Sequence, residues 1–224
     1  MNLTIEKGEY IVLCGKSGSG KSTILALLAR FYDVDSGAVY VDGKDIRTLT
    51  RASLRKAYTM VLQDTWLFCG TVHDNIAYGR DGATREDVIA AAKAARIHSF
   101  IECLPQGYDT ILTDEGTNIS KGQKQLLTIA RAILSNPSLL ILDEATSSVD
   151  TRTEMRIQQA MVNLMKNRTS LIIAHRLSTI RNSDVIVVMQ NGRIVQQGTH
   201  DELVSTPGVY LTLYEKQRKM AKNM

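Results

Sequence analysis

The sequence predicts an α/β domain built on a mostly parallel sheet, with a helical lobe inserted in its middle. Short apolar runs of strand length, such as residues 139–142 and 185–189, are typical of buried parallel strands. A helical stretch at 151–166, with Asp150 as its expected N-cap, separates two such runs, and this order indicates right-handed crossovers. Between about residues 74 and 135 the pattern is helical, with almost no strand signal.

Each predicted element follows from a local pattern. Continuous apolar or strand-like runs predict strands at residues 11–13, 38–41, 58–62, 139–142, 170–174 and 185–189. Start and stop signals predict helices at residues 21–30, 84–95, 120–134 and 151–166. Asn191-Gly192 predicts a type I′ hairpin before residues 193–196. We therefore expect an α/β core from residues 1–62 and 137–224 and a helical lobe from 63–136.

Composition excludes several classes of protein. The 224 residues are 44% hydrophobic, which excludes a disordered or low-complexity chain and suits one domain with an inserted lobe. The net charge, 27 − 23 = +4, comes without a Lys/Arg block, so we expect no nucleic-acid partner. No apolar stretch reaches 18 residues and no signal peptide is visible, so we expect no membrane-spanning segment. Cys14, Cys69 and Cys103 lack metal-ligand spacing and favour a reducing compartment, with Cys14 buried.

Residues 15–22 carry the strongest motif, because GKSGSGKS matches G-x-x-x-x-G-K-[ST] between a strand and a helix. Its glycines let backbone N–H groups face phosphate oxygens, and the following helix adds its N-terminal dipole. Lys21 can reach the β- and γ-phosphates, and Ser22 can ligate Mg²⁺. The alternative is a Gly/Ser-rich turn, which the flanking strand and helix disfavour. The expected nucleotide-binding residues are Gly15, Ser17, Gly18, Ser19, Gly20, Lys21, Ser22 and Thr23.

A second carboxylate is expected where a neighbouring strand ends. Residues 139–142 form a buried strand, and Asp143 emerges at its carboxyl end, where ligands bind in open α/β sheets. Asp143 is therefore a candidate Mg²⁺ ligand, and Glu144 is a candidate general base for an attacking water. The alternative, two acidic residues that cap the next helix, is weaker beside a phosphate loop.

Two single polar residues follow other strands. His175 comes after the apolar run 170–174; a lone histidine there is more often structural, but this strand is expected beside the other two. His175 would then face the γ-phosphate. Gln63 follows the predicted strand 58–62 and is an ordinary polar strand end on its own, yet it lies where the helical lobe begins.

Taken together, these motifs resemble the nucleotide-binding domain of an ATP-binding-cassette (ABC) transporter of the exporter type. The resemblance covers nearly the whole chain: residues 15–22 resemble the P-loop, Gln63 the Q-loop glutamine, 139–144 the Walker B strand, 147–150 the D-loop and His175 the switch histidine. Residues 68–72, 74–76 and 107–110 are similar to exporters rather than importers. The implied fold is a P-loop NTPase core with an incomplete antiparallel β subdomain.

The signature motif departs from the family pattern. Where L-S-G-G-Q is usual, the chain has Ile119 followed by Ser120, Lys121, Gly122 and Gln123. Ser120, Gly122 and the helix dipole remain, so the phosphate chemistry is retained in outline. Lys121 either adds a charge near the partner's γ-phosphate or points to solvent, and we favour solvent. Such variants, with Leu126 where arginine is common, occur in heterodimeric exporters, so the partner is either the same or a different chain.

The resemblance implies an ATPase coupled to transport. Two domains would face head to tail and trap two ATP molecules, with Glu144, His175 and Gln63 catalytic and Asp150 in the D-loop. Mg²⁺ would be held by Ser22, Gln63 and Asp143. Residues 63–82 would contact a membrane domain outside this chain, on the cytoplasmic side of the plasma membrane. The alternatives are a soluble ABC protein without a transport role and a binding-only or inactive cassette fragment.

The start of the chain also bears on this resemblance. The family's adenine-stacking aromatic lies further before the P-loop than the 14 residues present here. We therefore expect that the beginning of the domain is missing. Since stacking of a base on an aromatic ring contributes about 1–3 kcal/mol, ATP binding would be weaker than in a complete domain.

Overall fold

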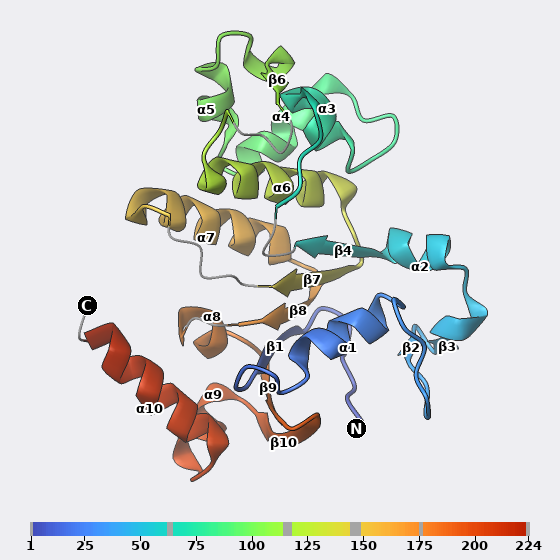
Figure 1. The fold of residues 1–224 in the computed structure, drawn as a ribbon, viewed down its shortest axis with the longest axis vertical. Helices are drawn as coiled ribbons and strands as arrows, with labels where there is room; N and C mark the ends of the chain where they lie inside the picture. The colour runs from blue at the N-terminus through green and yellow to red at the C-terminus, as the bar shows by residue number, and fades with distance from the viewer. Residues whose placement is uncertain (1, 62–64, 114–117, 144–148, 175–176, 223–224) are drawn as a thin grey trace. The chain divides into compact units, whose positions relative to one another are not determined.

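A computed structural model describes residues 2–61, 65–113, 118–143, 149–174 and 177–222 (Figure 1). The chain divides into two compact units. The first unit comprises Met1–Tyr58, Ser138–Ala145 and Arg168–Met224, and the second comprises Thr59–Pro137 and Thr146–Asn167.

The first unit is built on the predicted, mostly parallel sheet. Its strands follow the order β10-β9-β1-β8-β7. They are β1 (Tyr10–Cys14), β7 (Leu139–Asp143), β8 (Thr169–Ile173), β9 (Val185–Gln190) and β10 (Arg193–Gly198). The pairs β9–β1, β1–β8 and β8–β7 are parallel, and β9–β10 is antiparallel. The α/β fold class predicted from the sequence is confirmed.

Burial explains why the central strands are continuous apolar runs. Ile11, Val12 and Leu13 of β1 have no exposed surface, because β1 lies between β8 and β9 and is covered on both faces. In register, Leu13 pairs with Ile173 of β8, and Ile173 pairs with Asp143 of β7. The carboxyl ends of these three strands therefore lie at one edge of the sheet.

The first unit contains two tight hairpins. Asn191 (φ 50°) and Gly192 (φ 74°) join β9 to β10 with positive φ at both positions, as a type I′ turn requires. Asp42-Gly43 joins β2 (Tyr40–Val41) to β3 (Lys44–Asp45). The predicted strand at 38–41 is thus shorter than expected, because only its last two residues pair with β3.

The first helix of the first unit starts at Lys21, as predicted, and the unit also contains short helices that the sequence patterns did not predict. Its helices are α1 (Lys21–Leu28), α2 (Arg51–Ala57), α8 (Leu177–Arg181), α9 (His200–Ser205), α10 (Val209–Lys222) and the 3-10 helix η1 (Ile46–Thr48). The first helix ends before the predicted Arg30, because Arg30 adopts a left-handed conformation (φ 54°). Helix α10 packs on α9 and β10.

The second unit is mainly helical. Its helices are α3 (Val72–Ala77), α4 (Arg85–Ala94), α5 (His98–Glu102), α6 (Lys121–Ser135), α7 (Thr151–Met165) and the 3-10 helix η2 (Gly107–Asp109). Two short strands, β5 (Gly70–Thr71) and β6 (Ile111–Leu112), pair antiparallel. The strand β4 (Tyr58–Val61) starts at the last residue of a first-unit segment and continues in this unit.

Helix α6 organises the core of the second unit. It contacts α7 on one side and α3 and α4 on the other (Figure 1). Its buried residues Leu127, Ala130 and Leu134 recur at helical spacing, which gives the apolar stripe that a packed helix needs. Among the residues described in either unit, no helix is long and apolar enough to span a bilayer.

Candidate functional site

The phosphate loop of the first unit connects the end of β1 to the start of α1. Gly20, the N-cap of α1, has φ 99°, so the loop turns directly into the first helical turn. Gly15 lies against β9: a Cβ atom at this position would overlap the carbonyl oxygen of Met189. Gly15 is therefore required by space, and the loop is seated on the edge of the sheet.

Lys21 is folded back into its own loop. Its side chain is buried, and Nζ donates to the carbonyl oxygens of Gly15 and Lys16, both at 3.0 Å, and to Ser19 Oγ at 3.4 Å. Burial lowers the pKa of Lys21, while Cys14 and the negative charge of Asp143 act in the opposite direction. An ammonium group is thus held where the backbone of the loop converges.

The β9–β10 hairpin braces the other side of the loop. The N–H of Gly192 donates to the carbonyl oxygen of Ser19 at 3.0 Å, and Ser19 N–H donates to Lys16 O at 3.2 Å. The hairpin signal was readable in the sequence, but its contact with the phosphate loop was not. Gly192 and Ser19 are 192 − 19 = 173 positions apart in the sequence, and only the fold brings them into contact.

Asp143 and Ser22 offer the oxygen donors that a hard cation prefers. Asp143 is the last residue of β7 and pairs with Ile173 of β8. Ile173 in turn pairs with Leu13 of β1, the strand that leads into the phosphate loop. Ser22 is exposed in the first turn of α1. A carboxylate and a hydroxyl in the same unit as the phosphate loop fit Mg²⁺ with bound phosphates.

Cys14 lies directly before the loop as a buried free thiol, as predicted. Burial raises its pKa to about 12, against a smaller opposing effect of Lys21. The thiol is therefore neutral near pH 7 and packs as a small apolar group.

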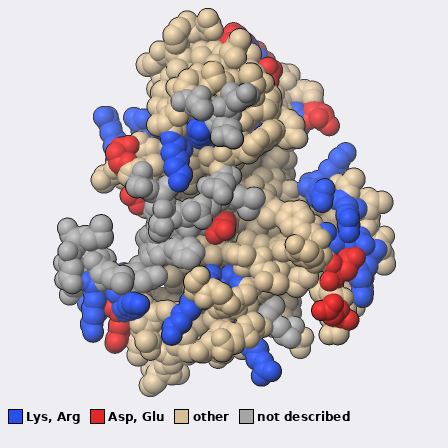
Figure 2. Space-filling view, in the orientation of Figure 1, with Lys and Arg blue, Asp and Glu red and all other residues tan. Residues whose placement is uncertain are grey.

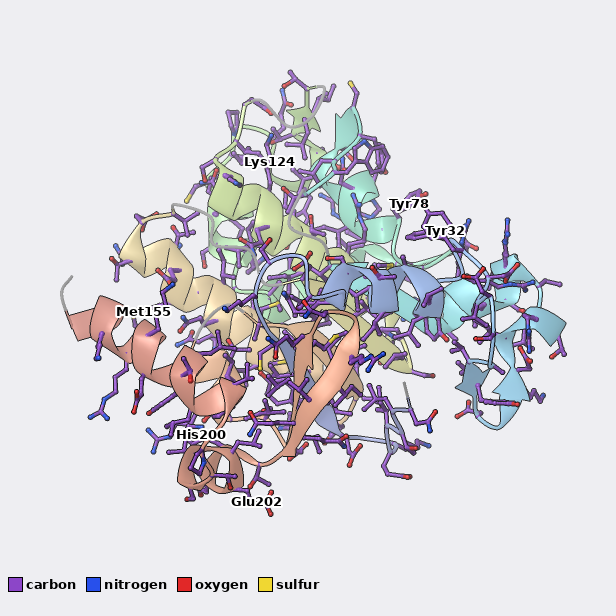
Figure 3. All side chains as sticks on the ribbon, turned by 60° about the horizontal axis from the view of Figure 1, so that its bottom comes forward. Tyr32, Tyr78, Lys124, Met155, His200 and Glu202 are labelled. Atoms are coloured by element: carbon purple, nitrogen blue, oxygen red, sulfur yellow. The ribbon has the colours of Figure 1, made fainter. Side chains whose placement is uncertain are left out.

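The signature segment lies in the second unit, at the N-terminus of α6. Ser120 Oγ accepts from Gln123 N–H at 3.3 Å, and Gln123 Oε1 accepts from Ser120 N–H at 2.8 Å, which makes a complete capping box. The side chain of Lys121 is exposed. Lys124 follows one turn later on the same helix (Figure 3).

Gly122 has no room for a side chain. A Cβ atom there would overlap Cγ2 of Thr153, and Cγ1 of Val149 lies 3.3 Å away. Asp150 caps α7 in the same region, since its carboxylate accepts from Thr153 N–H at 2.9 Å. Hydrogen bonding from Thr153, from its side chain first and from its backbone second, lowers the pKa of Asp150. The signature segment and the start of α7 are thus packed together within one unit.

Three predicted catalytic residues, Gln63, Glu144 and His175, lie outside the described residues. The remaining predicted positions fall into two groups. The first unit brings together residues 15–23 and Asp143, and the second brings together residues 120–123 and Asp150. On the face drawn in Figure 2, Lys and Arg atoms form several separate groups, with Asp and Glu atoms near most of them.

The structural role of one residue in the second unit was not predicted from the sequence. Arg131 lies on α6 between the buried Leu127 and Leu134, and its guanidinium hydrogen-bonds to Asn75 and Trp66. An arginine within the apolar stripe of a helix was the signal that could have revealed it.

Comparison with known proteins now places this architecture. Residues 1–147 match the ABC transporter family. The chain belongs to this family. It is 56% identical over 217 residues to the uncharacterized ABC transporter ATP-binding protein YfiC of Bacillus subtilis (strain 168), which covers 97% of this chain and 36% of that protein. It is 50% identical over 222 residues to the ATP-dependent lipid A-core flippase of Syntrophus aciditrophicus (strain SB), covering 99% of this chain and 37% of the flippase.

The fold agrees with a solved exporter. The structure of a bacterial Atm1-family ABC exporter with ATP bound superposes with a TM-score of 0.88 at 48% identity, over 95% of this chain and 37% of that one. The resemblance to exporter-type ABC domains predicted from the motifs is confirmed. The chain spans a little over a third of the length of these relatives.

Proposed function

We propose that this chain binds and hydrolyses ATP as the nucleotide-binding domain of an ABC exporter. The observation that carries the proposal is the buried ammonium group of Lys21, held inside a glycine-rich loop and within the electrostatic influence of Asp143. A desolvated cation at the start of a helix suits the triphosphate of a nucleotide. The close similarity to named ABC transporter proteins supports ATP as that nucleotide.

Binding would replace contacts that the loop now makes with itself. Lys21 Nζ, bonded to the carbonyls of Gly15 and Lys16, would turn to the β- and γ-phosphates, while backbone N–H groups of residues 15–20 donate to them. Ser22 and Asp143 would hold Mg²⁺. When bound, this ion neutralises charge that develops on the phosphate oxygens.

Hydrolysis would need a base and groups that position the water. Glu144 follows Asp143 at the carboxyl end of β7, so it is the proposed general base. Gln63 and His175 are proposed to orient the water and the γ-phosphate. These three assignments rest on their place in the sequence motifs.

A second domain would complete each site. Ser120, Gly122 and the N-terminus of α6 would meet the γ-phosphate bound by the partner domain, in a head-to-tail pair. The exposed position of Lys121 supports a solvent-facing side chain in the single domain. Whether the partner is a second copy or a different chain is decided by the subunit composition of the purified transporter.

Transport would follow from contact with a membrane domain on its cytoplasmic side. Relatives include proteins named ATP-binding/permease proteins, among them the fatty acid ABC transporter protein of Mycobacterium bovis, 54% identical over 210 residues. Residues 63–82 are the proposed contact. Trp66 and Tyr78 in this segment are 58% and 67% exposed, which provides apolar surface for a docking helix. Figure 3 labels Tyr78.

The decisive experiment separates binding from turnover. Glu144→Gln is expected to reduce steady-state ATP turnover about 100-fold, because the general base is lost while the phosphate loop is intact. Binding of a fluorescent ATP analogue is expected to stay within about twofold. The control is Glu215→Gln on the exposed part of α10.

The outcome also tests the alternatives. Turnover of Glu144→Gln within about threefold of the parent would remove Glu144 as the base. A parent chain that binds the analogue but shows no turnover, with or without a membrane partner, would instead identify a binding-only cassette.

A further inference from the structure

An arginine-centred cluster holds the exposed part of the second unit together. Three aromatic rings, those of Trp66, Phe68 and Tyr78, surround the guanidinium of Arg131, whose Cζ lies 5.9, 5.9 and 5.3 Å from the ring centroids. The rings also contact each other, with centroids 5.6 to 6.5 Å apart. We call these four residues the arginine cluster.

The hydrogen bonds of Arg131 go to the segment that carries the aromatic rings. Nε donates to the carbonyl oxygen of Asn75 at 2.7 Å, Nη2 to Asn75 Oδ1 at 3.1 Å and Nη1 to the carbonyl oxygen of Trp66 at 3.2 Å. Asn75 is almost fully buried and in turn bonds both backbone groups of Phe68. One side chain of α6 therefore fixes a segment that lies more than fifty positions earlier in the chain.

The cluster has a charged guanidinium at its centre. Among the described residues, no Asp or Glu forms an ion pair with Arg131. Burial lowers the pKa of its guanidinium. The charge is therefore satisfied by carbonyl oxygens and aromatic faces, an arrangement that fixes direction as well as position.

The same helix begins with the signature segment. Arg131 is on α6, whose N-cap is Ser120, and α6 is a continuous helix of 15 residues. Next to the cluster, a Cβ atom at Gly79 would overlap the carbonyl oxygen of Arg131, so the segment after Tyr78 lies directly on the helix. Helix α6 thus links the exposed aromatic rings at one end to Ser120 and Gly122 at the other.

We propose that Arg131 is a positioning residue that locks the exposed aromatic surface of residues 66–78 to the signature helix. A displacement of this surface would then move Ser120 as part of one rigid body. This inference rests on the proposed function, because the membrane domain of the proposed exporter would be the part that displaces the surface. Among the described residues of the second unit, Arg131 bonds Asn75 and Trp66 and lies over three aromatic rings, so we expect its effect on coupling and not on chemistry.

The first test uses the isolated chain and does not depend on transport. Trp66 is the single tryptophan of the sequence, so its fluorescence reports on the cluster alone. Arg131→Met should shift the emission to longer wavelength and raise quenching by acrylamide about twofold, since the ring loses its cationic and hydrogen-bonded neighbour. Arg85→Met is the matched control, because Arg85 bonds Asp109 and lies over Tyr108 in the same unit. Unchanged Trp66 fluorescence in Arg131→Met would overturn the proposal.

The second test measures coupling in the membrane-embedded transporter, reconstituted in liposomes. Arg131→Met should keep the affinity for an ATP analogue and the basal ATPase rate within about twofold, and lower transport-stimulated ATPase about fivefold. Arg131→Lys keeps the charge but cannot make the three hydrogen bonds together, so its loss should be smaller. If Arg131→Met fails to fold, the lysine variant carries the test.

The outcomes separate this inference from the proposed function. A parent transporter without ATPase activity would refute the proposed function, while the Trp66 signal would still report whether Arg131 holds the surface. An active transporter in which Arg131→Met and Arg131→Lys retain full stimulation would overturn the coupling role alone.

Discussion

The phosphate loop and the signature segment are both built to meet phosphate, but they are stabilised in different ways. In the phosphate loop the backbone carries the structure, and Lys21 bonds carbonyl oxygens only five and six residues away. In the signature segment, side chains cap the helix, and the helix is anchored by Arg131 to partners 56 and 65 positions away.

The difference predicts different vulnerabilities. The contacts of Lys21 are local to its loop, so a change of this side chain should affect ligand binding more than folding. A segment held by long-range packing should respond to volume changes at positions that touch no ligand.

The largest effect is expected at Lys21. Lys21→Ala should weaken binding of a fluorescent ATP analogue about 10- to 100-fold, because a hydrogen bond to a charged group contributes about 1.5–3 kcal/mol. Thermal stability should change little, since the bonds that Lys21 makes without nucleotide are offset by the cost of its burial. Lys16→Ala is the control in the same loop, with an exposed side chain. Equal affinities of the two variants would contradict the phosphate role of Lys21.

The next effect is expected at Gly122. Gly122→Ala should destabilise the second unit by about 1–3 kcal/mol, because its methyl group would overlap Cγ2 of Thr153. Thr153→Ser removes that carbon and keeps the hydroxyl, so the double variant should recover at least half of the loss. Urea unfolding followed by Trp66 fluorescence measures this, since Trp66 lies in the second unit. Additive effects of the two substitutions would show that this contact does not limit the site.

Gly18 provides the contrast within the phosphate loop. It has φ 75°, and a Cβ atom there meets nothing within 4 Å. Its glycine is required by backbone conformation and not by space. Gly18→Asn should therefore destabilise the protein less than Gly18→Ala, because asparagine tolerates the left-handed region. No substitution of a neighbouring residue should restore the stability lost in Gly18→Ala.

The local parts of this molecule were predictable from sequence. Strands of the sheet appear as apolar runs, and the caps Ser120, Thr84 and Asp150 all accept the hydrogen bonds expected of them. Asn191-Gly192 forms the predicted hairpin. These signals depend on a few neighbouring residues, so a single sequence carries them in full.

The long-range parts were not predictable. Nothing in the neighbourhood of Gly192 indicates that its N–H reaches Ser19, and nothing near Trp66 indicates an arginine 65 positions later. Such contacts depend on the packing of α6 and on the order of the strands. Gly122 is an example of such a long-range contact. The motif predicted a glycine at this position, but only the packing of Thr153 against it explains why a glycine is needed.

The smallest effects are expected at the two helix caps of the second unit, Ser120 and Asp150. Ser120→Ala should cost about 1 kcal/mol at any pH, since it removes the acceptor for Gln123 N–H. Asp150→Asn should leave stability at pH 7 nearly unchanged, because asparagine is as good a cap.

The two variants should differ in acid. The folded pKa of Asp150 lies below its ordinary value of 3.8, so its stabilisation is present above that value and is lost as the pH falls through the folded pKa. Asp150→Asn should therefore lose less stability than the parent on acidification below pH 3.8. The stability of Ser120→Ala should fall with pH by the same amount as that of the parent. Urea midpoints followed by Trp66 fluorescence measure both curves. If the stability of Asp150→Asn fell with pH as much as that of the parent, the charge of Asp150 would not contribute to the cap. Both helix caps of the packed signature region would then be held by neutral hydrogen bonds alone.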